Sequence, residues 1–313
     1  MTGWEVTPRL RVVSDNDYCG DPDGLVQLAH LLLCDSAEVP LVISSAVGTA
    51  HFEWTPDCPE RGAREARRVA ELAGRPEVRV AAGSPTPMPS AHEPARSEAV
   101  DALIAEAMRD DTDLPLFLTC GGGLTAVASA YLIEPRIADR LTLVWIGGEK
   151  PGTTDLPDDV RWRETNTNID LTAARVVFDS PIPLWQVPAG VYDAPMVSRA
   201  EWATRVRPHG PLGTHLFDVI AARVDMLSRG INLGETYCMG DNPLVLLTAL
   251  TGSYSPTPST STWVDLPRPR LDDRGLAVDN PGGSPMRRFT GLDVRLLLED
   301  FYARVLLRAG AAG

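Results

Sequence analysis

The sequence has no long hydrophobic segment. None of its apolar runs approaches the roughly 20 residues with which a helix crosses a bilayer. Its first residues, MTGWEVTPRLRVV, contain neither the basic nor the apolar stretch of a secretory signal peptide. We therefore expect a cytoplasmic protein that has no membrane partner.

Cysteine is scarce, and its pattern is irregular. The five cysteines include no Cys-x-x-Cys pair, and their odd number and wide spacing argue against a disulfide framework and against a zinc site. We expect reduced thiols, which agrees with a cytoplasmic location. The cysteines are Cys19, Cys34, Cys58, Cys120 and Cys238.

The sequence also lacks an excess of positive charge, and it lacks several catalytic motifs. The net charge is −13, which argues against binding to nucleic acid or to an anionic membrane. No Gly-x-Ser-x-Gly elbow is present, which disfavours a serine hydrolase. The Gly121–Gly123 turn lacks both the spacing of Gly-x-Gly-x-x-Gly and the lysine of a P-loop. This turn indicates a phosphate cradle, a close approach to a ligand, or only a tight turn.

The sequence does contain a regular alternation of short apolar runs and helix-like segments. Strands are predicted at 10–14, 39–44, 78–82, 114–119, 141–146 and 182–187, and helices at 24–33, 61–72, 97–108, 124–133, 172–178, 216–226, 243–250 and 292–307. This alternation indicates βαβ units around a buried parallel sheet. We predict one α/β domain over residues 1–313, with a single open, mostly parallel sheet flanked by helices. A mostly helical insertion is expected at about 190–240, and a hairpin pairing 261–265 with 275–279.

Four aspartates occur within nine positions at the end of the first predicted strand. They are Asp15, Asp17, Asp21 and Asp23. Acids also favour helix N-termini, and Asp21 suits an N-cap before Pro22, so capping explains part of the cluster. Capping does not explain Asp15 and Asp17, whose like charges repel unless a cation offsets them. Oxygen ligands of this kind suit Ca²⁺ or Mg²⁺ better than zinc.

Three later segments carry polar groups, and the sequence allows two alternative roles for each of them. Glu164–Asn168 (ETNTN) combines a carboxylate with amides that bind sugar hydroxyls, or it caps the next helix. Asp241, in Gly-Asp-Asn-Pro, is either a distant metal ligand or an N-cap. His92 lies in a proline-rich loop over residues 83–95 and faces either a ligand or the solvent.

Taken in order, these segments resemble the inosine–uridine-type nucleoside hydrolases over roughly residues 10 to 308. DNDYCGDPDG resembles the aspartate cluster of that family, and ETNTNIDLTAARVVFDSPIPLWQVP resembles its Glu-Phe-Asn segment with the following helix and strand. TCGGGLTAVA, LTLVWIGGE and GDNPLVLLTAL resemble its glycine-rich turn, its strand ending in Gly-Gly and its late His-Asp-Pro segment. The resemblance implies a Rossmann-like nucleoside hydrolase fold. It also implies hydrolysis of the N-glycosidic bond of a ribonucleoside, to ribose and free base, by a Ca²⁺-activated water.

The resemblance further implies a role for individual residues. Asp17 would act as the general base toward the water, and Asp15 would support the cluster. The implied metal ligands are Asp17, Asp23, the main-chain carbonyl of Thr125, and Asp241. The implied substrate contacts are Asp21, Thr49, Glu164, Asn166 and His92. The expected partners are a nucleoside and further copies of the chain, as a dimer or a tetramer.

Three positions depart from the family pattern. The ribose-binding asparagine that the family has after its second strand falls near Thr49 here. Pro22 stands where the motif has its fourth aspartate, and Asp23 follows one place later. Gly240 stands where the family has a histidine credited with protonating the leaving group. Without that histidine, the leaving base would be protonated by His92, by Tyr192 or by water, or it would leave while stacked on Trp185. The second hypothesis is therefore a non-catalytic ribose- or metal-binding protein of the same fold.

Overall fold

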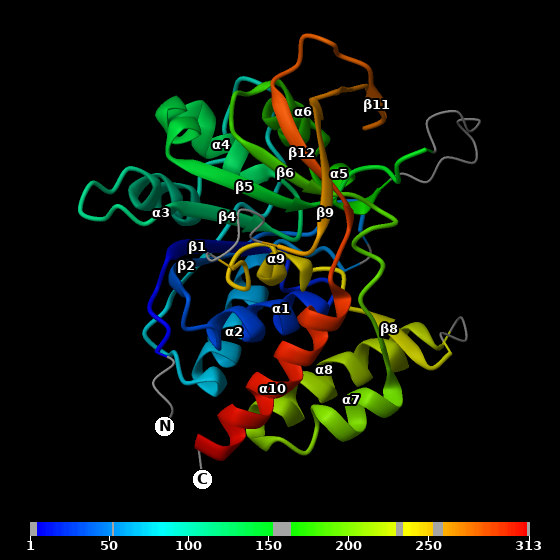
Figure 1. Ribbon diagram of the computed structural model, residues 1–313. Coiled ribbons are helices and arrows are strands. Elements are labelled where there is room, and N and C mark those ends of the chain that lie inside the picture. Colours follow the sequence, from blue (N-terminus) through cyan, green and yellow to red (C-terminus); the bar gives the residue numbers. More distant parts are fainter. Residues whose placement is uncertain (1–4, 52, 153–163, 230–233, 253–258, 312–313) are drawn as a thin grey trace.

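A mostly parallel sheet runs through the middle of the molecule (Figure 1). The computed structural model describes residues 5–51, 53–152, 164–229, 234–252 and 259–311. Within these residues the sheet has eight strands in the order β3-β2-β1-β4-β5-β6-β12-β9, and only β9 runs antiparallel to its neighbour. The strands are β1 (Leu10–Asn16), β2 (Ala37–Ser44), β3 (Arg79–Ala82), β4 (Leu116–Cys120), β5 (Leu141–Ile146), β6 (Leu184–Val187), β9 (Thr262–Pro267) and β12 (Pro285–Gly291). The predicted fold class is confirmed.

Helices cover both faces of the sheet, which explains why the central strands are continuously apolar. Every residue of β1 is buried, as expected of a parallel strand with helices on each side. In Figure 1 one layer lies above the sheet and a thicker layer below it. The upper layer contains α3 (Glu98–Ala107), α4 (Thr125–Ile133) and α6 (Leu171–Asp179). The lower layer contains α1 (Asp23–Leu32), α2 (Cys58–Ala73), α8 (Gly210–Leu227), α9 (Pro243–Leu246) and α10 (Val294–Ala311).

The segment 190–240 forms part of the lower layer. It contains α7 (Arg199–Arg205), α8 and a two-stranded antiparallel pair, β7 (Met196–Ser198) with β8 (Thr236–Cys238). Its helices pack against α2 and α10, so the segment helps to bury the apolar face of the N-terminal half. None of the helices described in the structure has the length and apolar character needed to cross a bilayer.

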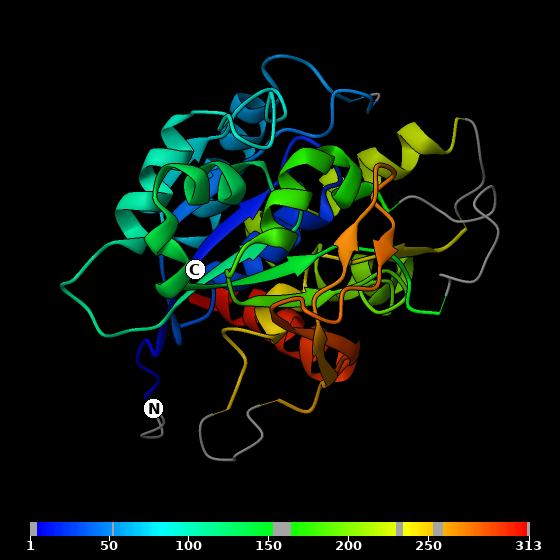
Figure 2. The same ribbon diagram turned by 90° about the horizontal axis from the view of Figure 1, so that it is seen from above.

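The predicted C-terminal hairpin is wrong. β9 pairs with β12 at the edge of the main sheet, whereas residues 277–278 form β11 (Ala277–Val278), which pairs with β10 (Arg270–Leu271). This small hairpin, drawn in orange in Figure 2, packs beside α6. The expected helix 243–250 is also shorter, because α9 ends at Leu246. The sequence also predicts a loop rich in proline, glycine and acids over residues 147–159, after β5. This prediction can be compared only up to Gly152, since 153–163 lie outside the described residues.

The strand order creates one natural place for a ligand site. β1 pairs in parallel with β2 on one side and with β4 on the other. The connections from these strands leave in opposite directions, so a crevice opens beyond the carboxyl ends of β1 and β4. The aspartate cluster follows β1, and the Gly121–Gly123 turn follows β4.

Candidate active site

A cavity of about 290 Å³ lies at this crevice. It is lined by residues that follow β1, β2 and β4, and by the last residue of β5. Residues from the distant segments 164–169 and 240–241, together with Tyr192 and Arg223, complete the wall. The structure brings six of the residues implied by the sequence into this one cavity. They are Asp17, Asp21, Asp23, Glu164, Asn166 and Asp241.

The end of β1 supplies the innermost acids. Asp15 is fully buried; one of its oxygens accepts a hydrogen bond from Ser45, and the other has no partner. Burial raises the pKa of Asp15 to about 7. Asp17 lies on the cavity wall, and its own backbone N–H donates to the side chain of Asn16 at 2.8 Å. Burial, followed by the charges of Asp241 and Asp21, raises the pKa of Asp17 well above its ordinary value.

Asp23 and Asp241 meet although 218 residues separate them. The backbone N–H of Asp241 donates to the Asp23 carboxylate at 3.1 Å, and the Asn16 side-chain amide donates to the Asp241 carboxylate at 2.9 Å. Burial and the neighbouring acids raise the pKa of Asp23, and burial raises that of Asp241 to about 7. Asn16 therefore links the two ends of the cluster, although it was not among the residues singled out from the sequence.

This arrangement fits a hard divalent cation. Asp17, Asp23 and Asp241 face one another with only oxygen donors, and each carboxylate makes ionisation of its neighbours less favourable. A bound cation would reverse that effect, because its positive charge favours the ionised form of every acid around it. The unpartnered oxygen of buried Asp15 is a further sign that the cluster is electrostatically incomplete by itself.

The opposite side of the cavity is built around Glu164. This carboxylate is 2% exposed and accepts hydrogen bonds from the backbone N–H groups of Gly148, Asn166 and Thr167 at 2.8–3.0 Å. The Tyr192 hydroxyl also donates to it, at 3.3 Å. Glu164 caps α5 (Thr165–Ile169), so its capping role and its position on the cavity wall go together.

Asn166 is held just as firmly. Its side-chain amide donates to the carbonyls of Gly121 and Ile146, at 3.0 and 2.9 Å. Both donors of the amide group point at the ends of β4 and β5, which leaves its oxygen as the group available to a ligand. Gly121 itself has to be glycine, because a Cβ there would lie 2.4 Å from the Asn16 amide and 2.7 Å from the Asp241 carboxyl carbon.

Asp21 differs from the other acids because it is exposed. The Tyr237 hydroxyl from β8 donates to its carboxylate at 2.5 Å. The N-cap of α1 is Pro22, so the expectation that Asp21 caps this helix is wrong by one residue. Asp21 is thereby left at the rim of the cavity, where its carboxylate is accessible to a ligand.

Four other residues considered from the sequence lie outside this cavity. Thr49 is exposed, and the cavity wall is formed instead by its neighbours Val47 and His51. His92 is exposed and lines a different hollow, beside Tyr131 and Arg175. Thr125 does not line the cavity, and its hydroxyl donates to Asp170 at 2.8 Å. Trp185 packs between Phe117 and Phe289 instead of facing a ligand.

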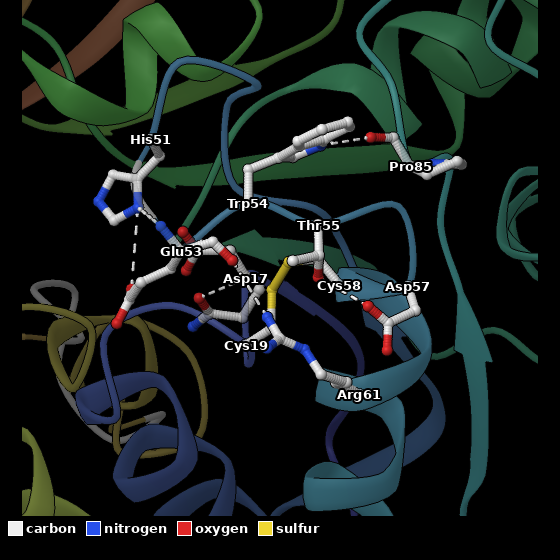
Figure 3. The surroundings of a disulfide bond; sticks show 11 residues. Asp17, Cys19, His51, Glu53, Trp54, Thr55, Asp57, Cys58, Arg61 and Pro85 are labelled. Atoms are coloured by element: carbon white, nitrogen blue, oxygen red, sulfur yellow. Dashed lines mark hydrogen bonds and ion pairs between the residues drawn. A yellow bond between two sulfur atoms is a disulfide. The ribbon is translucent and has the colours of Figure 1, made fainter.

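The structure also corrects the prediction that all cysteines are reduced. Cys19 and Cys58 form a disulfide, with their Cα atoms 5.7 Å apart (Figure 3). Cys19 lies in the loop between β1 and α1, two residues after Asp17, and Cys58 is the first residue of α2. The bridge thus fastens the loop that carries Asp17 and Asp21 to the start of a long helix. Cys34, Cys120 and Cys238 are free thiols.

Comparison with protein families gives a match over residues 12–279 to the inosine-uridine preferring nucleoside hydrolases. The chain belongs to this family. Members of the family hydrolyse N-glycosidic bonds, and the chain is therefore identified as an enzyme of this class. A search of curated protein sequences gave no match.

Solved structures show the same fold. The purine-preferring ribonucleoside hydrolase from Gardnerella vaginalis has a TM-score of 0.74 and 20% identity, over 96% of this chain and 99% of that one. The inosine-uridine preferring nucleoside hydrolase from Bacillus anthracis has a TM-score of 0.68 and 17% identity, over 95% and 99%. The type III effector protein XopQ, solved with adenosine diphosphate ribose, has a TM-score of 0.64 and 20% identity, over 97% and 93%.

Proposed function

We propose that this nucleoside hydrolase family member cleaves the N-glycosidic bond of a ribonucleoside and releases ribose and the free base. The observation that carries the proposal is the convergence of buried Asp17, Asp23 and Asp241 with Glu164 and Asn166 in one cavity. An acidic cluster and a set of hydroxyl-binding groups are the two parts that hydrolysis of a nucleoside requires.

We propose Ca²⁺ as the metal, since the family is metal-dependent and the donors here are all oxygens. Asp17, Asp23 and Asp241 would hold it, and the placement of Asp23 beside Asp241 supports Asp23 as the replacement for the acid lost at Pro22. The carbonyl of Thr125 is not supported as a ligand, because Thr125 lies outside the cavity; Gly121 lines it instead. When bound, such an ion orients a water and lowers its pKa.

Individual residues of the chain have separate roles in the proposed reaction. Asp17 accepts the proton of the attacking water, as a carboxylate at the cavity wall can do. Glu164 and Asn166 bind ribose hydroxyls, and their positions are fixed in advance by hydrogen bonds to Gly148, Gly121 and the start of α5. The negative charge around the sugar favours the oxocarbenium-like transition state over the neutral nucleoside.

Other assignments follow from the family and stay predictions. They are a role in purine or pyrimidine salvage, a cytoplasmic location, and a homo-oligomer of two or four chains. The Cys19–Cys58 disulfide removes one support for the cytoplasmic location, because that expectation relied in part on reduced thiols.

The decisive experiment measures ribose release from a panel of purine and pyrimidine ribonucleosides, with Ca²⁺ and with a chelator. Asp17→Asn keeps the shape of the side chain but removes the base, so we expect turnover to fall by about 10²- to 10⁴-fold. Asp35→Asn, an exposed position outside the cavity, is the matched control and is expected to leave turnover unchanged.

A binding measurement distinguishes the hydrolase hypothesis from the hypothesis of a non-catalytic binding protein. Asp17→Asn should still bind ribonucleosides in equilibrium dialysis although its turnover is lost, because Glu164 and Asn166 remain to hold the ribose. If wild-type protein with Ca²⁺ binds a ribonucleoside but releases no ribose from any of them, the non-catalytic binding hypothesis replaces this one.

A further inference from the structure

The carboxylate of Glu164 is already filled by hydrogen bonds from the described residues around it. An ionised carboxylate has about four lone pairs, two on each oxygen. Oε2 accepts from the Gly148 N–H and from both the N–H and the hydroxyl of Thr167, at 2.7–2.9 Å. Oε1 accepts from the Asn166 N–H at 3.0 Å and from the Tyr192 hydroxyl at 3.3 Å. A ribose hydroxyl can therefore donate to Glu164 only by taking the place of one of these donors.

The Tyr192 hydroxyl is the donor that can give way. The other donors are backbone groups and a hydroxyl that belong to α5 and to the turn after β5, so their positions are fixed by the fold. Tyr192 reaches Glu164 with the tip of a long side chain, makes the longest of these hydrogen bonds, and lines the same cavity. The sequence suggested Tyr192 as an aid to departure of the base, whereas the structure places its hydroxyl on Glu164.

The loop after β6 and Gly240 together hold the half-buried Tyr192 in place. Its backbone N–H donates to the Pro188 carbonyl at 3.1 Å, and its carbonyl accepts from the Cys238 thiol at 3.6 Å. A Cβ added at Gly240 would lie 3.5 Å from Cδ2 of the Tyr192 ring. Any side chain at position 240 would therefore begin in contact with this ring, and the glycine leaves the tyrosine its room.

A sugar hydroxyl has the chemistry to replace Tyr192 on Glu164 without the loss of a hydrogen bond. It donates one hydrogen bond and accepts others, so it can donate to Oε1 while its own oxygen accepts from Tyr192. Burial, followed by the charge of Glu164, raises the pKa of Tyr192, so the phenol keeps the proton that it has to donate. A group that only accepts, or a hydrogen atom in place of the hydroxyl, would leave one of the two partners unsatisfied.

We propose that Tyr192 and Glu164 bind the same ribose hydroxyl, which donates to Glu164 Oε1 and accepts from the Tyr192 hydroxyl. This inference rests on the proposed function. It makes Tyr192 a substrate-binding residue that selects for a sugar carrying this hydroxyl. It also explains why the contact between Tyr192 and Glu164 is long, because in the presence of the sugar each of them has a better partner.

The test compares inosine with 2′-, 3′- and 5′-deoxyinosine. Tyr192→Phe keeps the ring and removes only the hydroxyl. Dissociation constants are measured by equilibrium dialysis with Ca²⁺ in the Asp17→Asn background, and KM and kcat by release of the sugar from protein with Asp17 intact. We expect Tyr192→Phe to weaken binding of inosine about 3- to 10-fold and to raise KM in parallel, with kcat changed by less than about twofold. For one of the three deoxy analogues the weakening should vanish, because the hydroxyl that Tyr192 binds is already missing.

Tyr131→Phe is the matched control, because Tyr131 is also half-buried but lines the separate hollow beside His92. It should bind all four nucleosides like the parent protein. Equal weakening of all four by Tyr192→Phe would mean that the hydroxyl only supports the structure, and unchanged or tighter binding of inosine would mean that it makes no favourable contact with the sugar; either result overturns the proposal. Wild-type protein that binds these nucleosides but cleaves none of them refutes the proposed function, and the dissociation constants then still decide the role of Tyr192.

Discussion

The Cys19–Cys58 disulfide makes a quantitative prediction about stability. The bridge joins residues 39 positions apart. In the chain-entropy model, closing a loop of this length removes disorder from the unfolded chain equivalent to about 4 kcal/mol at 25 °C. With a urea dependence of about 3 kcal/mol per molar, reduction should lower the urea midpoint by roughly 1 M. The effect is expected to act on the whole chain, because the bridge constrains the unfolded state.

The assay is urea unfolding of wild-type protein with and without a reductant, beside two serine variants. Cys19→Ser breaks the bridge at its half-buried end and should unfold like the reduced wild type, whether or not reductant is present. Cys238→Ser, another half-buried cysteine but a free thiol, is the matched control and should unfold like the oxidised protein. Reduction should also weaken cation binding, since Asp17 and Asp21 lie in the loop that the bridge fastens.

Thiol titration provides the clearest refutation. Denatured, unreduced protein should expose three of its five cysteine thiols. Five reactive thiols would show that no bridge forms, and an unchanged urea midpoint on reduction would show that the loop-closure reasoning does not describe this chain.

Three further predictions concern the cavity and the core. Gly121→Ala should weaken Ca²⁺ binding in calorimetric titration, because its Cβ would displace the Asp241 carboxylate, whereas Gly282→Ala, with open space around it, should bind normally. In the presence of a chelator, the urea concentration at the midpoint of unfolding should decrease as the pH is raised from 4 to 8. Burial raises the pKa of Asp15 and of Asp241 from 3.8 to about 7, so the folded chain holds these protons more tightly than the unfolded chain. Their stabilisation is complete below about pH 4 and is lost as the pH rises through 7; a midpoint that stays constant would contradict this, and added Ca²⁺ should reduce the fall. Arg268→Met should lower the free energy of unfolding by about 3 kcal/mol or more, measured in urea, because the buried guanidinium donates to three backbone carbonyls that would be left unpaired.

The order of strands and helices in the first half could be predicted from the sequence because local patterns determine it. Each short apolar run became a strand of the sheet, and each amphipathic segment became a helix, with ends shifted by a few residues. The convergence of Asp17 and Asp241 could be proposed only through the resemblance to a family, since no local pattern relates residues so far apart in the chain.

The C-terminal strands could not be predicted in the same way. β12 (Pro285–Gly291) was missed, and with it the true partner of β9. Its sequence, PMRRFTG, contains two arginines whose charges hide the strand pattern. In the structure, Arg287 places its guanidinium over the rings of Trp185 and Trp263, an interaction that joins three strands and cannot be recognised in one segment alone.

Residues in loops were the least predictable part of the site. Thr49 and His51 are separated by one residue, yet only His51 lines the cavity. A loop has no periodicity that relates sequence position to direction, so the resemblance indicated the region but not the side chain. The pairing of Cys19 with Cys58 was missed for a similar reason, because nothing in their spacing shows that α2 begins beside the loop after β1.

The hydrogen bonds from Asn16 to Asp241 and from Asp241 to Asp23 have a consequence for biosynthesis. The ribosome synthesises Asp17 and Asp23 long before Asp241. A growing chain therefore cannot complete its cation pocket until more than three quarters of its length has been made. Tight binding of the ion is therefore expected only late in synthesis, and chains truncated before Asp241 should not bind it tightly.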